Sequence, residues 1–212
     1  MRTAQDLPQP LLWPQLQVSE GEKSYTCNQF SLSSERPMIG FCPGAEFGPA
    51  KRWPHYHYAE LAKQLIDEGY QVVLFGSAKD HEAGNEILAA LNTEQQAWCR
   101  NLAGETQLDQ AVILIAACKA IVTNDSGLMH VAAALNRPLV ALYGPSSPDF
   151  TPPLSHKARV IRLITGYHKV RKGDAAEGYH QSLIDITPQR VLEELNALLL
   201  SLIHISEPTR PY

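Results

Sequence analysis

A short polar turn separates an apolar, strand-like stretch from a helix of small residues in the run Val122-Thr-Asn-Asp-Ser-Gly-Leu-Met-His-Val-Ala-Ala-Ala-Leu135. Asn124, Asp125 and Ser126 carry side-chain oxygens of the kind that cap a helix, and Gly127 lets its backbone approach a ligand. The amides of the first helical turn lack intrahelical partners, and together with the helix dipole they favour an anion. His130 follows Ser126 by four residues, so we expect it to add a donor on the same face. The run therefore predicts a phosphate-binding site in an α/β fold.

Two further segments repeat this design, because each is an apolar run that ends in a polar turn rich in Gly and Pro. The first run leads into Pro43-Gly-Ala-Glu-Phe-Gly-Pro-Ala-Lys-Arg-Trp-Pro54, where Lys51 and Arg52 stand near the end of the loop. The second, Leu139-Val-Ala-Leu-Tyr143, leads into Gly144-Pro-Ser-Ser147, whose amides and hydroxyls suit a phosphate or a ribose. We expect the three turns to converge at one edge of a sheet.

Apolar periodicity alternates between strand and helix from Pro37 onward. The pattern predicts strands at 38–42, 71–75, 98–102, 120–123 and 139–143, a possible strand at 158–164, and helices at 56–68, 80–92, 107–117 and from Ser126. A last helix begins after Thr187, the expected N-cap, with Pro188 in its first position. Such alternation indicates a Rossmann-like parallel sheet with helices on both faces, which binds ligands at the carboxyl ends of its strands.

The two ends of the chain lack this pattern. Residues 1–36 carry three prolines and are predicted to be a lead-in or interdomain segment with at most a short strand. After Leu200 the helical patterning stops, and residues 201–212 resemble a foreign tail. The predicted domain is therefore 37–200.

Composition narrows the class of protein. The chain has 212 residues, 44% of them hydrophobic, and a formal charge of −4, which argues against a general nucleic-acid surface. Basic residues do gather between 157 and 172, a solvated face unless they approach anionic phosphates or a membrane surface. The four cysteines show no CxxC spacing, and two of them fall inside apolar runs typical of buried free thiols, which indicates a reducing cytoplasm. No apolar stretch reaches the roughly 18 residues that span a bilayer, and no signal-peptide pattern is present.

Other chemistries fit the residues less well. His55 and His57 flank Tyr56, but residues two apart do not share a helix face, and no further ligand stands at metal-binding spacing. Asp125, Ser126 and His130 lack the Gly-x-Ser-x-Gly context of a hydrolase, and no Gly-x-Gly-x-x-Gly follows the first strand. We therefore predict no metal site and no dinucleotide cofactor.

Taken in order, four motifs resemble those of the ADP-heptose:lipopolysaccharide heptosyltransferases, glycosyltransferase family nine. They are Pro43-Gly-Ala with Lys51-Arg-Trp-Pro54, Phe75-Gly-Ser77, Asn124-Asp-Ser-Gly-Leu-Met-His130 and Leu142-Tyr-Gly-Pro-Ser146. The resemblance covers roughly residues 15–200 and implies the C-terminal, donor-binding domain of a two-domain GT-B glycosyltransferase. It also implies that the acceptor domain, with the aspartate base of that family, has no counterpart in this chain.

The resemblance implies a reaction and roles for individual residues. Heptose would pass from ADP-heptose to the lipopolysaccharide inner core with inversion, without a cofactor and without a metal, since the sequence has no Asp-x-Asp motif. Lys51 and His130 would stabilise the departing ADP, and Asp125 would bind heptose hydroxyls. The remaining donor-binding residues carried over from the family are Gly44, Ala45, Gly76, Ser126, Gly127 and Met129, the last near adenine although an apolar residue there is more often part of a core.

An acidic residue near the Gly76-Ser77 turn is also implied, but the chain offers both Lys79 and Asp80, so neither is assigned. Two alternatives remain open. One is a nucleotide-sugar epimerase, which would form product from the donor alone. The other is a non-catalytic ADP-sugar binding module. Contact with the cytoplasmic face of the inner membrane is a further expectation.

Overall fold

The computed structural model describes residues 12–46, 48–166, 170 and 172–205, with side chains described as far as residue 201. Six strands form one parallel sheet: β1 (Met38–Cys42), β2 (Gln71–Leu74), β3 (Cys99–Asn101), β4 (Ala120–Asn124), β5 (Leu139–Tyr143) and β6 (Ala158–Arg162). The helices are α1 (Glu20–Gln29), α2 (His55–Asp67), α3 (His81–Ala89), α4 (Thr93–Gln96), α5 (Leu108–Ala117), α6 (Gly127–Ala134), α7 (Gln181–Ile184) and α8 (Pro188–Ile205). Three 3₁₀ turns complete the described elements: η2 (Pro49–Lys51), η3 (Ala78–Asp80) and η4 (Ala176–Gly178).

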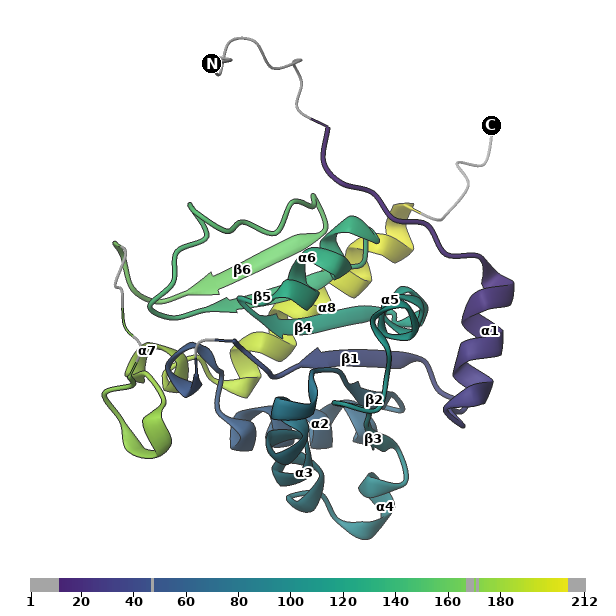
Figure 1. Ribbon diagram of the computed structural model, residues 1–212, viewed down its shortest axis with the longest axis horizontal. Coiled ribbons are helices and arrows are strands. Elements are labelled where there is room, and N and C mark those ends of the chain that lie inside the picture. Colours follow the sequence, from purple (N-terminus) through teal and green to yellow (C-terminus); the bar gives the residue numbers. More distant parts are fainter. Residues whose placement is uncertain (1–11, 47, 167–169, 171, 206–212) are drawn as a thin grey trace.

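The strand order is β3-β2-β1-β4-β5-β6 (Figure 1). The chain adds β2 and β3 on one side of β1 and then crosses back to place β4, β5 and β6 on the other side, so the strand order reverses between β1 and β4. Ile39 of β1 pairs with Val72 of β2 on one side and with Ala120 of β4 on the other. This is the order of a Rossmann-type sheet, in which the crevice at the reversal is the usual ligand site. The predicted α/β fold with a parallel sheet is confirmed.

Helices cover both faces of the sheet and bury every residue of β1. Ile39 and Phe41 face a core shared with α2, α3 and α8, whereas Met38 and Cys42 face a second core shared with α5 and α6. Burial on both faces explains why β1 is continuously apolar instead of alternating, unlike the edge strands β3 and β6, which carry arginines.

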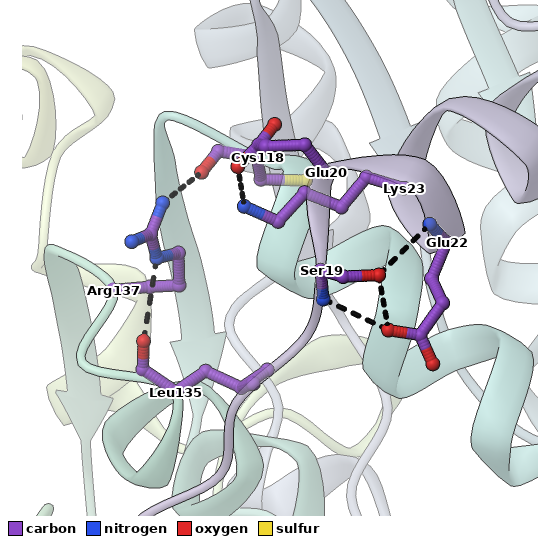
Figure 2. Close-up of polar contacts among 7 residues, drawn as sticks. All are labelled: Ser19, Glu20, Glu22, Lys23, Cys118, Leu135 and Arg137. Carbon is purple, nitrogen blue, oxygen red and sulfur yellow. Dashed lines mark hydrogen bonds and ion pairs between the residues drawn. The ribbon is translucent and has the colours of Figure 1, made fainter.

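Residues 1–36 depart from the prediction, because α1 lies within them. Ser19 and Glu22 form a capping box, in which the Glu22 amide donates to Ser19 Oγ at 3.2 Å and the Ser19 amide to Glu22 Oε2 at 2.8 Å (Figure 2). The prediction of at most a short strand is therefore wrong. It failed because Thr26 is the buried residue of this helix, so the sequence carries almost no apolar periodicity there.

The lead-in segment packs at the edge of the sheet opposite the predicted ligand turns. Leu16 donates its amide to the carbonyl of Ala134 at the end of α6, and α1 packs on α5 (Figure 1). Arg137 donates to the Leu135 carbonyl at 3.4 Å and to the Cys118 carbonyl at 3.5 Å, which close α6 and α5 respectively (Figure 2). Cationic groups stabilise such helix C-termini.

The C-terminal helix also extends further than expected. The Arg190 amide donates to Thr187 Oγ1 at 3.2 Å, which confirms Thr187 as the cap before Pro188. However, α8 continues to Ile205, so the expected end of helical structure after Leu200 is wrong. The rest of the predicted tail, 206–212, lies outside the described residues. Among the described helices, none combines the length and the apolar character that crossing a bilayer requires.

Candidate functional site

A cavity of about 650 Å³ opens at the carboxyl edge of the sheet, where the strand order reverses between β1 and β4. Its walls come from the loop after β1, from the turn 75–80 after β2, from residues 106–111 at the start of α5, and from residues 126–128 at the start of α6. The predicted residues Gly44, Ala45, Gly76, Ser126 and Gly127 all line it. The structure thus brings together turns that lie far apart in the sequence.

Asn124 clamps the base of loop 43–54. Its Nδ2 donates to the Pro43 carbonyl at 2.8 Å, and its Oδ1 accepts from the Trp53 amide and the Tyr58 hydroxyl, each at 3.1 Å. The side chain is fully buried and its polar groups have partners, as burial demands. The sequence suggested a helix cap for Asn124, and that interpretation is wrong because the side chain reaches β1's loop instead of its own helix.

Lys51 lies at the end of η2 and pairs with Asp125 in the turn after β4. Its Nζ is 3.8 Å from Asp125 Oδ2, and the two side chains are 23% and 9% exposed. Neither residue lines the cavity, but their chain neighbours Arg52 and Ser126 do, which places this ion pair beside it. Burial, and secondly the charge of Asp125, raise the pKa of the Tyr143 hydroxyl. A cation and a carboxylate thus stand side by side next to the cavity.

Asp80, which the sequence left unassigned, organises the opposite wall. Its Oδ2 accepts from the Ser77 amide at 2.9 Å and from Ser77 Oγ at 2.8 Å, and its Oδ1 lies 3.3 Å from Arg52 Nη2. A Cβ at Gly44 would lie 2.4 Å from the Asp80 carboxyl carbon, and a Cβ at Gly76 would lie 2.8 Å from the Asp80 Cβ. Both glycines therefore make room for Asp80. A Ser-x-x-Asp capping pattern was the signal that pointed to it.

The start of α6 leaves the amides of Gly127 and Leu128 without a capping bond, whereas the Met129 amide donates to the Ser126 carbonyl at 3.2 Å. Ser126 occupies the N-cap position, but its side chain makes no capping bond, and its Oγ lies 3.3 Å from Thr123 Oγ1. A Cβ at Gly127 would meet nothing within 4 Å, so the helix begins beside free space in the cavity wall. Unfilled amides next to open space suit an anion, as the sequence predicted.

Met129 and His130, like Lys51 and Asp125, do not line the cavity. Met129 is fully buried in the core, where its sulfur accepts from the Tyr143 hydroxyl at 3.2 Å, and it is not among the residues lining the cavity. His130 is exposed and does not line the cavity either. α6 buries Met129 with Ala132 and Ala133 against the sheet, whereas Gly127 and His130 are both exposed.

The third predicted turn stays apart from the cavity. Ser146 and Ser147 are buried, and Ser147 Oγ bonds to Asp149. A Cβ at Gly144 would lie 2.7 Å from Leu183 of α7. This turn therefore packs against the C-terminal segment instead of presenting its hydroxyls to a ligand.

Alternate residues of Trp53-Pro-His-Tyr-His57 anchor that same C-terminal segment. Trp53 Nε1 donates to the Ile186 carbonyl at 2.8 Å, His57 Nε2 donates to the Ile184 carbonyl at 2.8 Å, and His55 Nδ1 lies 2.8 Å from the Tyr179 hydroxyl. Burial lowers the pKa of His57, although the bond to Ile184 opposes the shift. Within the described residues no group of three His, Cys, Asp or Glu side chains is arranged to hold a metal ion.

The start of α5 is a wall that the sequence did not indicate. Thr106, Gln107, Leu108 and Ala111 line the cavity, and Leu108 is 70% exposed. An exposed leucine facing a cavity offers an apolar surface of the kind that a flat ring covers. Its only sequence signal was a large apolar residue, Leu108, at the start of the predicted helix 107–117.

The floor of the cavity includes Cys42, whose thiol is not a nucleophile here. Burial raises the pKa of Cys42 to about 12, so the thiol stays protonated at neutral pH. All four cysteines are free, and Cys42, Cys99 and Cys118 are buried, as expected from the sequence. The site can therefore bind an anion and a flat apolar group, with Lys51 and Asp125 beside them.

The family model described as glycosyltransferase family 9 (heptosyltransferase) matches residues 1–180. The chain belongs to glycosyltransferase family 9. It is 92% identical to lipopolysaccharide heptosyltransferase 2 of Salmonella typhimurium over 199 residues, which cover 94% of this chain and 57% of that protein. The family 9 chain thus spans little more than half the length of this curated relative.

Solved structures agree with this assignment. The structure of E. coli ADP-heptose lipopolysaccharide heptosyltransferase II shares 94% identity with a TM-score of 0.89, covering 96% of this chain and 58% of that one. E. coli heptosyltransferase WaaC with ADP-2-deoxy-2-fluoro heptose is 22% identical with a TM-score of 0.59, covering 87% and 50%, and so shows a shared fold. The family 9 domain described above therefore has the GT-B type of architecture that the sequence predicted.

Proposed function

We propose that this chain is the donor-binding part of a heptosyltransferase that moves L-glycero-D-manno-heptose from ADP-heptose to a heptose of the lipopolysaccharide inner core. The observation that carries the proposal is the placement of the open first turn of α6 and the Lys51–Asp125 pair beside one cavity. Support comes from the names of the similar proteins, one of which was solved with an ADP-heptose analogue.

The cavity suggests how the donor lies. The nucleoside fits between the apolar start of α5 and the Gly44, Ala45 and Gly76 wall, and the diphosphate fits over the α6 amides at Ser126 and Gly127. Lys51 then faces the diphosphate and stabilises charge that develops on the departing ADP, while Asp125 faces the heptose hydroxyls. In this arrangement neither His130, which is exposed, nor Met129, which is buried in the core, contacts the donor. A contact from either residue would require α6 to reorient.

Transfer with inversion needs an acceptor hydroxyl, a base and a direct displacement. We assign the base and the acceptor site to the part of the relatives that this chain does not match. The described basic residues Lys157, Arg159, Arg162 and Lys172 are candidates for contact with phosphates of the acceptor or with the inner membrane, on the cytoplasmic side. The other two members of that basic cluster, Lys169 and Arg171, lie outside the described residues.

Calorimetric titration with ADP, GDP and UDP tests donor binding. We expect saturable binding that favours ADP, and a Lys51→Ala variant should bind ADP about tenfold or more weakly, as for the loss of one charge-assisted contact. Lys63→Ala is the matched control, because Lys63 lies on α2 and pairs with Glu60. Equal affinity for the three nucleotides, or no effect of Lys51→Ala, would contradict the proposal.

A second assay separates the transferase from an epimerase. ADP-heptose is incubated with the chain alone. In a parallel reaction the portion of the Salmonella relative that this chain does not match is added together with a heptose-bearing acceptor. Product that needs the acceptor supports transfer, whereas a changed donor sugar formed without acceptor supports an epimerase. Binding without either product would identify an ADP-sugar binding module.

A further inference from the structure

Loop 43–54 sends two consecutive basic side chains towards two different acidic residues. Lys51 pairs with Asp125 in the turn after β4, at 3.8 Å. Arg52 pairs with Asp80 in the turn after β2, at 3.3 Å between Nη2 and Oδ1. The loop after β1 is therefore joined to both neighbouring turns by ion pairs, and the two ion pairs come from adjacent residues of the loop.

Arg52 also closes the loop on itself. The same Nη2 donates to the carbonyl of Ala45, seven residues earlier, at 3.3 Å. Asp80 is itself held by the Ser77 amide and hydroxyl, so Arg52 attaches the loop to a rigid point. Only 23% of the Arg52 side chain is exposed, and its Nε is buried without a partner among the described residues. A guanidinium held in this way has little freedom to move towards a ligand.

The position of Lys51 depends on these contacts. Its amide donates to the Gly48 carbonyl at 3.2 Å and the Arg52 amide donates to the Pro49 carbonyl at 3.0 Å, which together form the short turn η2. A turn of three residues has few bonds of its own, so its orientation follows from the residues that anchor its ends. Asn124 anchors the base of the loop through Trp53, and Arg52 joins the end of the loop to Ala45 near its start.

We propose that Arg52 is a positioning residue, which holds loop 43–54 in the conformation that directs Lys51 to Asp125 and to the donor diphosphate. The inference rests on the proposed function for its effect on donor affinity, but its effect on the loop does not require any ligand. Arg52 acts through Lys51 and contributes no independent contact to the donor.

Hydrogen exchange without ligand tests the loop itself. In an Arg52→Gln variant, exchange at the amides of residues 51 and 52 should become about tenfold faster, because the anchor that keeps η2 closed is lost. Exchange in β5 should stay unchanged. Arg190→Gln, which removes an exposed ion pair with Glu194 on α8, is the matched control and should leave η2 as it was. Unchanged exchange at residues 51 and 52 would overturn the proposal.

A double-mutant cycle then asks whether Arg52 acts through Lys51. ADP affinity is measured for the unmutated chain, Lys51→Ala, Arg52→Gln and the double variant, with cooperative melting to confirm that each is folded. If Arg52 positions Lys51, the double variant should bind ADP no more weakly than Lys51→Ala alone. Losses that multiply would show a direct and independent contact by Arg52, and would overturn the proposal.

Arg52→Lys provides a second variant, which keeps the charge and is expected to recover part of the ADP affinity and part of the exchange protection. If the unmutated chain binds no ADP, the proposed function fails, and the exchange experiment alone decides whether Arg52 positions the loop. The two failures are therefore distinguishable.

Discussion

The two sides of the cavity are built in opposite ways. Loop 43–54 is closed by side chains: Asn124 joins its two ends, and Arg52 bonds to Ala45 and Asp80. The turn after β4 is open, because Ser126 makes no capping bond and Gly127 faces free space. The closed side holds a cation in place, and the open side leaves amides ready for an anion. The side chains that close the first side should therefore determine stability, whereas changes in the open turn should lower ligand affinity with little effect on stability.

Replacing Asn124 by Ala should give the largest effect. The Trp53 amide, the Tyr58 hydroxyl and the Pro43 carbonyl would lose a partner in a fully buried position, so we expect a loss of about 3 kcal/mol or more in the free energy of unfolding. Chemical denaturation measures this. Asn92→Ala, which removes the exposed N-cap of α4, is the control and should cost only about 1 kcal/mol. Equal costs would mean that Asn124 is not a clamp.

Two of the cavity glycines, Gly44 and Gly127, sharpen the comparison further, since neither has a positive φ and each can accept Ala in its backbone conformation. Gly44→Ala would drive a Cβ into the Asp80 carboxylate, and should cost about 1–3 kcal/mol of stability. Gly127→Ala meets no neighbour, so stability should stay the same or rise by up to about 1 kcal/mol.

For Gly127→Ala the loss should appear in ADP affinity instead, because the methyl group would occupy space above the α6 amides. Melting curves and calorimetric titrations of both variants provide the measurement. A destabilised Gly127→Ala with intact ADP binding would reverse the roles given to the two sides.

The smallest effect is expected at Ser126. Its hydroxyl does not cap α6, so Ser126→Ala should change the free energy of unfolding by no more than about 0.5 kcal/mol. Ser19→Ala is the contrasting variant, because Ser19 completes the capping box of α1 and its loss should cost about 1 kcal/mol. A larger cost at Ser126 than at Ser19 would show that the turn is closed in solution.

Much of the fold was predictable because the inner strands β1, β2, β4 and β5 are mostly apolar runs that end in turns containing Gly or Pro. All six predicted strands are present, as are the helices α2, α3, α5, α6 and α8. The helix α1 was missed because it packs on α5 with almost no apolar stripe. The extension of α8 to Ile205 was missed because its last residues interrupt the helical pattern. Periodicity reports burial against a core, and these segments have little of it.

The candidate site was predictable in its backbone and not in its side chains. The turns at Gly44, Gly76 and Gly127 do meet at one cavity, since parallel strands bring their carboxyl ends to one edge. The side chains of Asn124 and Asp80 were misassigned or left out, because their partners lie 71 and 28 residues away at Trp53 and Arg52. Local spacing carries no information about such contacts.

By itself, the sequence of this protein determined a parallel sheet, the edge at which a ligand binds and the family to which the chain belongs, since these follow from hydrophobic periodicity and from ordered motifs. Only the tertiary structure decided which polar side chains bind one another and which remain open to a ligand. The side chains of Asn124 and Asp80 bond to other groups of the protein, and Met129 is buried in the core. The backbone at Gly127 remains open to a ligand. The physical reason is that a buried polar group must find a partner, and that partner is chosen by proximity in space.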